Sequence, residues 1–206
     1  LKKPVAWVQE RGDHFVNCPQ GRDNVSPATA ALDKRGKVLA VKVDTVADMG
    51  AYLSQYATFI PYVGALMLAG VYAFPAMHVR LKYAYTNTVP VDAYRGAGRP
   101  EAAYLIERLM DRIAIETGMT PAEVRRRNFI QPDQFPWATP VGRTYDSGEF
   151  DGHMTRAMEV ASWDAFKDRL KAAKKAGKIR GIGMATYIEA CGGGAPENAW
   201  MSLEKD

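Results

Sequence analysis

The feature that most constrains the fold is a glycine-rich stretch, Tyr94–Arg99, between a strand pattern and a helix pattern. Before it, residues 79–87 alternate Val, Leu and Tyr with Arg, Lys and Ala, as in a strand with one buried face. After it, apolar residues recur at helical spacing from Pro100, which suits the first helical position, to Gly118, which suits a C-terminal cap. The sequence therefore predicts a tight glycine turn that leads from a strand into a long helix.

That helix is expected to bury a broad apolar stripe and to expose its charges. The stripe comprises Ala102, Leu105, Ile106, Leu109, Met110, Ile113 and Ile115, and the side chains expected to point elsewhere are Glu107, Arg108, Asp111 and Arg112.

Other segments carry recognisable signals for helices and strands. Two β-rich runs, 26–32 and 38–46, flank a turn-rich linker and predict a hairpin. Part of 56–68 is expected to be helical with Pro61 in its first turn, and Thr120, Pro121 and Glu123 predict a capped helix start. Two more helices are expected at 150–161 and 163–176, and strands at 5–8, 179–191 and 199–203.

These elements indicate an α+β fold of mixed strands and helices, because hairpins and separate helices replace a regular βαβ alternation. The Pro- and Gly-rich loop 131–148 is expected to hold a domain boundary, which divides the chain into 1–141 and 142–206. The chain opens on Leu1 and its last residues look like an interrupted strand, so we expect a piece of a longer protein.

Composition excludes several classes of function. A net charge of +4 over 206 residues is too small and too scattered to indicate nucleic-acid binding. Arg125, Arg126 and Arg127 are expected to form a solvated helix end, since successive helical positions point about 100° apart. No apolar run approaches the roughly 20 residues of a membrane span. The two cysteines lie far apart, which favours a reducing compartment and a cytoplasmic location.

No metal site is expected either. His14 and Cys18 stand four positions apart but lack a second pair of ligands, so they are weak zinc candidates. Glu189, next to the glycine run 192–194, is expected to be structural, although that run could line an approach to a site. Cys191 carries no visible activating group.

The glycine stretch is the strongest candidate for a binding site. Backbone N–H groups that no side chain covers, next to a helix N-terminus, favour an anion such as phosphate. The spacing matches neither the Walker motif nor GxGxxG. On these grounds alone three interpretations stay open: a cofactor site, a non-redox module for another phosphate ligand, and a structural or interaction domain whose glycines serve only turns. Arg99 is expected to bond loop carbonyls, with phosphate as a second option.

Several segments together resemble the molybdenum hydroxylases, the family of xanthine dehydrogenase, aldehyde oxidase and the carbon monoxide dehydrogenase large chain. The central match is the stretch 93–102, Ala-Tyr-Arg-Gly-Ala-Gly-Arg-Pro-Glu-Ala. Four further segments that look like family landmarks occur in the same order, at 7–15, 48–52, 86–87 and 123–128.

The resemblance implies an internal fragment of the large subunit, which binds molybdopterin or molybdopterin cytosine dinucleotide. The residue matching Arg95 would offer its main-chain N–H beside molybdenum, and Gly96, Ala97 and Gly98 would form the wall of the active-site cavity. Family chemistry oxidises a small aldehyde or heterocycle by attack of a molybdenum-bound hydroxyl group, with hydride transfer. The catalytic glutamate and two other family loops would lie outside residues 1–206, so we assign no catalytic residue here and expect the fragment alone to be inactive.

Departures from the family pattern narrow the expected substrates. Copper-containing carbon monoxide dehydrogenases carry cysteine where Gly96 stands, so oxidation of carbon monoxide by that route is not expected. Purine-oxidising members carry an aromatic residue at Ala97 and an arginine near Val63, so xanthine is not expected. The resemblance also implies an iron–sulfur subunit and an FAD subunit as partners, and a dimer of heterotrimers in the full enzyme.

Overall fold

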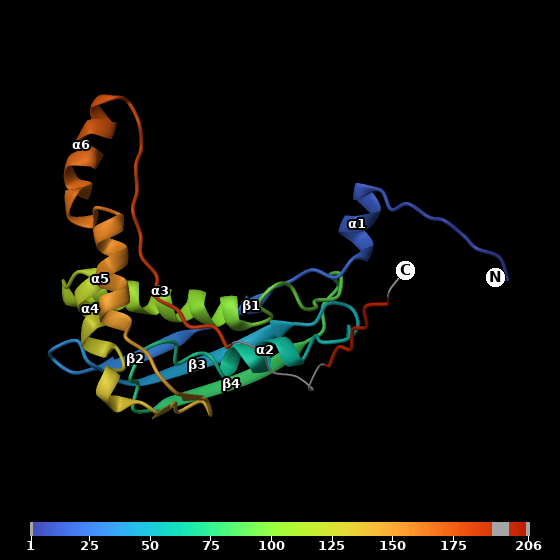
Figure 1. Cartoon of the computed structure of the whole chain (residues 1–206), viewed down its shortest axis with the longest axis horizontal. Helices are drawn as coiled ribbons and strands as arrows, with labels where there is room; N and C mark the ends of the chain where they lie inside the picture. The colour runs from blue at the N-terminus through green and yellow to red at the C-terminus, as the bar shows by residue number, and fades with distance from the viewer. Residues whose placement is uncertain (1, 191–197, 205–206) are drawn as a thin grey trace.

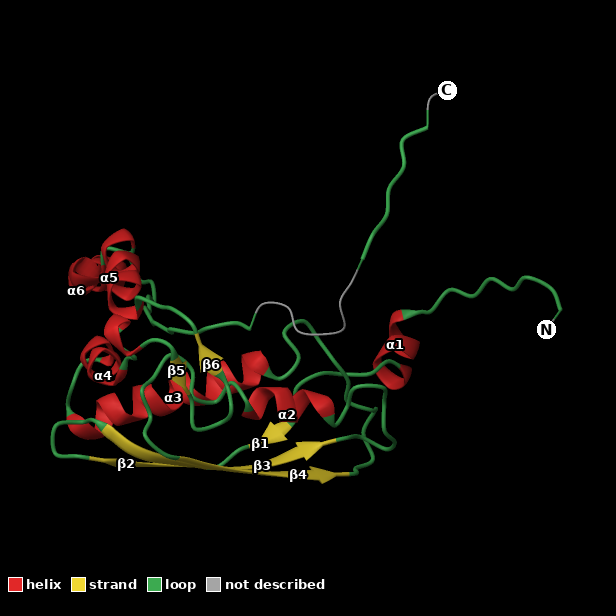
Figure 2. Ribbon diagram, turned by 60° about the horizontal axis from the view of Figure 1, so that its bottom comes forward, coloured by secondary structure: helices red, strands yellow, loops and turns green. Residues whose placement is uncertain are grey.

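The computed structural model describes residues 2–190 and 198–204 of the chain. A four-stranded sheet lies along one side of the molecule, and helices cover one face of that sheet (Figure 2). The strands are β1 (Asn24–Val25), β2 (Ala28–Leu32), β3 (Val38–Asp48) and β4 (Met77–Ala84), with a separate pair formed by β5 (Trp137–Ala138) and β6 (Thr144–Tyr145). The helices are α1 (Arg11–Asn17), α2 (Phe59–Ala65), α3 (Arg99–Thr117), α4 (Pro121–Asn128), α5 (Phe150–Val160) and α6 (Phe166–Lys175), with short 3₁₀ turns at η1 (Pro132–Gln134) and η2 (Trp163–Ala165). The expected α+β class is confirmed.

Strand β3 organises the sheet. β1 and β2 pair antiparallel with it along one edge, and β4 pairs parallel with it along the other. The predicted hairpin is confirmed as β2–β3, whose turn is closed by Asp33 Oδ1, an acceptor for the N–H groups of Arg35 and Lys37 at 2.8 Å each. The sequence did not predict that β3 and β4 run parallel, a pairing that needs the crossover through α2.

The two faces of the sheet differ in chemistry. Val41 and Val43 of β3 point toward the helices and are almost fully buried. Asp44 points the other way, and the Arg80 Nε of the neighbouring strand lies 2.7 Å from its carboxylate. A charged outer face explains why, among the described residues, the helices pack on the inner face alone.

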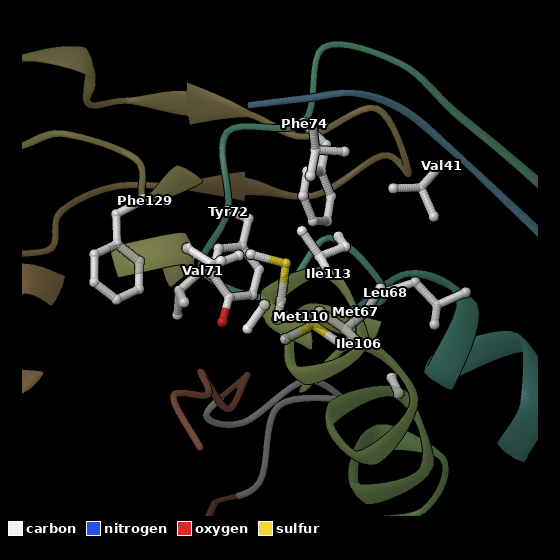
Figure 3. Packing of buried hydrophobic residues seen from close by; sticks show 14 of the residues in the cluster. Val41, Met67, Leu68, Val71, Tyr72, Phe74, Ile106, Met110, Ile113 and Phe129 are labelled. Atoms are coloured by element: carbon white, nitrogen blue, oxygen red, sulfur yellow. The ribbon is translucent and has the colours of Figure 1, made fainter. Parts of the chain in front are cut away.

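Helix α3 supplies a large part of the core. Its Ile106, Met110 and Ile113 are at most 4% exposed and meet the segment around Tyr72 and Phe74 (Figure 3). Burial of one such side chain stabilises the fold by about 1.5–3 kcal/mol. The helix begins after Gly98 and ends before Gly118, as the sequence predicted, and both glycines have positive φ.

Three expectations about α3 and α4 are wrong. Ile115 is 72% exposed, because it stands nine positions after Ile106 and therefore lies on the opposite side of the helix, about 180° away. Glu107 is buried and so is Arg125, which is fully inaccessible rather than solvated. The reason is that α4 packs on the Glu107 side of α3, so that the arginine finds a carboxylate between the helices. Arg126 and Arg127 stay at the surface as expected.

The remaining helix predictions are confirmed. Pro61 lies in the first turn of α2, and Thr120 with Glu123 forms the capping box of α4. The predicted helices at 150–161 and 163–176 correspond to α5 and to η2 followed by α6. α5 and α6 project from the end of the molecule opposite α1 (Figure 1). In the described part of the chain no helix has the length and apolar character to cross a bilayer.

The strands expected at 5–8, 179–191 and 199–203 are wrong for the residues that the structure describes. These stretches are extended or irregular, and within the described ranges no neighbouring strand pairs with them. β-Propensity alone does not make a strand, because its backbone groups need a partner. The segment before position 190 is instead held by side chains, for example by Glu107 Oε2, which accepts from Thr186 N–H at 2.8 Å. Cys191 and the glycine run 192–194 lie outside the described residues.

Candidate functional site

The glycine stretch lies beside the ends of two parallel strands. β3 and β4 pair to their last residues, Asp48 and Ala84, and therefore end at the same edge of the sheet. The chain then returns through Val91, whose backbone bridges to Gln20, and enters the loop 94–98 directly before α3. This arrangement places the loop and the N-terminus of a 19-residue helix at the edge where a parallel sheet commonly presents its ligand sites.

Three successive residues of the loop have left-handed backbone conformations. The φ values are +96° for Gly96, +42° for Ala97 and +87° for Gly98. Ala97 N–H donates to Tyr94 O at 2.7 Å, and Arg99 N–H donates to Gly96 O at 3.2 Å. The result is a compact double turn that ends in the first turn of α3.

Several backbone N–H groups of the turn make no hydrogen bond within it. Within residues 2–190 and 198–204, the N–H groups of Arg95, Gly96 and Gly98 have no hydrogen-bond acceptor. They stand next to the positive end of the α3 dipole, and the Arg95 side chain is exposed beside them. Grouped N–H donors at a helix N-terminus are the chemistry that binds phosphate and other anions.

Gly98 is fixed by the neighbouring helix. A Cβ at this position would lie 2.0 Å from Ile60 O and 2.8 Å from Gly64 N, so any side chain would collide with α2. The contact is reciprocal, because a Cβ on Gly64 would lie 2.6 Å from Gly98 O. Gly64 and Gly98 thus allow the backbones of α2 and of the loop to come into contact, and this contact fixes how closely the loop packs on α2.

Two arginine side chains donate hydrogen bonds to carbonyl groups of the loop. Arg22 Nη2 donates to Arg95 O, and its guanidinium lies 5.0 Å from the centre of the Tyr94 ring. Arg99 Nε donates to Gly96 O at 2.9 Å, while its Nη1 donates to Ala190 O at 2.7 Å. The expectation that Arg99 bonds loop carbonyls is confirmed.

Two carboxylates join the segments around the loop. Asp48 Oδ1 accepts from Gly50 N–H and from Thr86 Oγ1, both at 2.7 Å, which unites two stretches that the sequence analysis singled out separately. Asp92 accepts from Tyr56 N–H at 3.1 Å and from Ser54 Oγ, and so ties the segment before α2 to the loop. Desolvation raises the pKa of each carboxyl, but the hydrogen bonds outweigh it and both pKa values are lowered.

The structure therefore brings Arg95, Gly96, Ala97 and Gly98 together in one turn, in which the N–H groups of Arg95, Gly96 and Gly98 have no acceptor among the described residues, and it pairs Glu189 with Arg99 at 2.6 Å. Sequence reasoning missed Arg22, Gly64 and Asp92. Local patterns carried no signal for them, since Arg22 and Gly64 reach the loop from distant parts of the chain and the partners of Asp92 lie in the segment 54–56.

The sequence of the chain is similar to those of known proteins. A family model described as the molybdopterin cofactor-binding domain matches residues 1–129. The carbon monoxide dehydrogenase large chain of Hydrogenophaga pseudoflava is 34% identical over 94% of this chain and 25% of its own length. Subunit gamma of the 6-hydroxypseudooxynicotine dehydrogenase complex of Paenarthrobacter nicotinovorans is 28% identical over 100% of this chain and 26% of its own length.

The fold of the chain is also similar to parts of solved structures. Quinoline 2-oxidoreductase from Pseudomonas putida 86 superposes with a TM-score of 0.76 at 29% identity, over 83% of this chain and 22% of that one. The carbon monoxide dehydrogenase of Oligotropha carboxidovorans gives a TM-score of 0.70 at 32% identity, over 82% of this chain and 22% of that one. The chain spans about a quarter of the length of the curated relatives it matches.

Proposed function

The chain belongs to the molybdopterin cofactor-binding domain family of the molybdenum hydroxylases, and from this premise we propose that its loop 95–98 holds the molybdenum cofactor. The observation that carries the proposal is the set of backbone N–H groups at Arg95, Gly96 and Gly98, none of which has an acceptor in the described part of the chain.

The residues present fit such a group. Molybdopterin is anionic, and the loop offers backbone donors, a helix dipole and the exposed Arg95 side chain. Glycine at positions 96 and 98 permits the left-handed backbone that forms the loop, and at position 98 it also permits the close approach of α2. Ala97 adds only a single methyl group to the loop.

Each residue then has a defined role. The N–H groups of Arg95 and Gly96 would donate to ligand oxygen atoms, and Gly98 would keep the loop seated on α2. When bound, the cofactor supplies a two-electron redox centre and the oxygen that enters the product. The protein orients the ligand and excludes water there, and we assign no general base to this chain.

For the whole protein we propose an oxidoreductase that hydroxylates a small aldehyde or a nitrogen heterocycle. Gly96 offers no thiolate for a copper ion, which argues against a copper-dependent route. We further propose electron transfer to an iron–sulfur subunit and an FAD subunit in a dimer of heterotrimers. This is supported by relatives whose names mark them as subunits of complexes, such as the nicotine 6-hydroxylase large subunit of Paenarthrobacter nicotinovorans. The cytosine dinucleotide form of the cofactor belongs to the same proposal, as does a cytoplasmic location.

We also propose that the chain contains parts of two cofactor-binding domains, 1–141 and 142–206. Two observations support the division: the family match ends at residue 129, and α5 and α6 project away from the sheet (Figure 1).

The test is the metal content of the full-length subunit, purified with its natural partners. We expect stoichiometric molybdenum together with an oxidisable pterin, and turnover in a panel of aldehydes, nitrogen heterocycles and carbon monoxide. Gly96→Val should remove most of the molybdenum, because its Cβ would lie 2.5 Å from Pro100 Cγ and reshape the loop.

The matched control is Gly118→Val. Gly118 also has a positive φ, of +69°, but a Cβ there meets no atom within 4 Å and the position is at the far end of α3. The control carries the backbone strain without touching the loop, so its molybdenum content should stay close to that of the wild type. Full molybdenum content in Gly96→Val would overturn the assignment of the loop.

A further inference from the structure

The loop carbonyls of two consecutive residues are each bound by a different arginine. Arg22 Nη2 donates to Arg95 O, and Arg99 Nε donates to Gly96 O at 2.9 Å. The two guanidiniums come from separate parts of the chain: Arg22 precedes the sheet, and Arg99 opens α3. We infer that Arg22 and Arg99 are positioning residues that together fix the loop in its ligand-binding conformation before a ligand arrives.

Peptide geometry gives these contacts a directional effect. In a planar trans peptide the C=O of one residue and the N–H of the next point in opposite directions. When Arg22 holds Arg95 O, the Gly96 N–H is therefore directed away from Arg22. When Arg99 holds Gly96 O, the Ala97 N–H is directed toward Tyr94 O, which accepts it at 2.7 Å. The two arginines thus decide which way the loop donors face.

The loop needs such fixation because its own sequence provides little. Glycine loses more backbone freedom on ordering than any other residue, and two of the three left-handed positions are glycines. A flexible loop would have to be ordered by the ligand, which weakens binding. The bonds from Arg22 and Arg99 instead supply this order in the folded protein.

Arg22 is itself held in place. Its Nε lies 3.7 Å from Glu101 Oε2, and its guanidinium stacks on Tyr94. Glu101 Oε2 is buried and has no hydrogen-bond partner among the described residues, so the cation is the nearest compensation for its charge. The guanidinium is thereby kept against the loop, although the residue is exposed.

Arg99 connects the loop to a distant segment. Its Nη1 lies 2.6 Å from the Glu189 carboxylate and donates to Ala190 O at 2.7 Å, about 90 positions along the chain. That segment is held in turn by Glu107, which accepts from Thr186 N–H at 2.8 Å. Within the described part of the chain, Arg99 therefore joins the loop to residues 189 and 190.

The inference rests on the proposed function only where it concerns the cofactor, so the experiment has two separate readouts. Both use the full-length subunit in its complex. The first is hydrogen exchange of the Ala97 and residue-99 amides, whose acceptors lie within the loop, in protein from a host that makes no molybdopterin. The second is molybdenum per subunit in protein from a competent host.

The variants are Arg22→Ala, Arg99→Ala and Arg99→Lys, with Arg156→Ala as the control. Arg156 lies in an exposed ion pair with Glu159 on α5, far from the loop in sequence and in Figure 1. Arg22→Ala and Arg99→Ala should each accelerate hydrogen exchange of the two amides at least tenfold and lower the molybdenum content at least threefold. Lysine offers one ammonium in place of a fixed fork, so Arg99→Lys should keep the Glu189 pair and recover the exchange protection only in part. Arg156→Ala should change neither readout.

If both alanine variants exchange the two amides at the wild-type rate, the inference is overturned. Faster exchange with unchanged molybdenum content would also overturn it, because the loop would then bind the cofactor equally well without the two arginine contacts. If the wild-type protein itself contains no molybdenum, the proposed function fails, and the exchange comparison in cofactor-free protein still decides whether the arginines fix the loop.

Discussion

Arg125 Nη2 lies 2.8 Å from Glu107 Oε2 in an ion pair that solvent does not reach from the arginine side. The pair joins α4 to α3, and both partners have further bonds. Glu107 also accepts from Tyr72 Oη and from Thr186 N–H, while Arg125 also donates to Asp111 Oδ1 at 3.0 Å. One buried network therefore connects two helices, the core and the segment that reaches the glycine loop.

The first prediction concerns the loss of one partner. Arg125→Met should destabilise the protein by about 3–5 kcal/mol, because it leaves the Glu107 carboxylate buried without its cation. The measurement is thermal unfolding of the full-length subunit, with a fall of several degrees expected. Arg126→Ala is the matched control on the same helix: its pair with Asp151 is half-exposed and should be worth about 1 kcal/mol at most. Equal effects of the two substitutions would contradict the role of burial.

The second prediction concerns Gly98. Gly98→Ala should cost several kcal/mol and separate α2 from the loop, because its Cβ would lie 2.0 Å from Ile60 O. Gly118→Ala should cost only about 1–2 kcal/mol, the strain of a left-handed backbone in open space. Unfolding of both variants, together with proteolysis within the segment 56–66, separates the two effects. A Gly98→Ala protein as stable as Gly118→Ala would show that α2 shifts freely.

The third prediction concerns the pH dependence due to Asp92. Its pKa is lowered despite desolvation, so its stabilising effect is present above the unfolded value of about 3.9 and is lost as the pH falls through the folded value. Asp92→Asn should lower the melting temperature at pH 7, and the difference from wild type should shrink below about pH 4. Asp168→Asn, on the exposed face of α6, is the control. A difference that stays constant from pH 7 to pH 3 would contradict this interpretation.

The fourth prediction concerns Tyr72, whose pKa is raised well above its usual value by burial and by the Glu107 carboxylate. A raised pKa stabilises the fold below about pH 10 and ceases to do so as the pH rises further. Tyr72→Phe should cost about 1–3 kcal/mol at neutral pH, since Glu107 loses a donor. The variant should then lose less stability than wild type between pH 9 and pH 11. An equal loss in both proteins would mean that the tyrosine does not titrate with unfolding.

Local sequence signals were sufficient where a few adjacent residues determine the outcome. The glycine turn into α3, the Gly118 cap and the Thr120–Glu123 capping box were all predicted and are confirmed. Each depends on backbone conformation and hydrogen bonds within one turn of helix. The resemblance of the stretch 93–102 to molybdenum hydroxylases likewise gave the family that the comparisons show.

Other features depended on partners that local patterns do not contain. A run of three arginines looks the same whether α4 packs on Glu107 or lies in water, so Arg125 could be placed only by the helix contact. The β-prone residues at 179–190 form no strand in the described chain, because no backbone edge pairs with them there. The sequence by itself determined the turn, the helix and the family. Only the tertiary structure decided that Arg22 meets the loop at Arg95 O and that Arg99 also reaches Ala190 O, because hydrogen bonds between residues 73 or more positions apart form only after the intervening chain has packed.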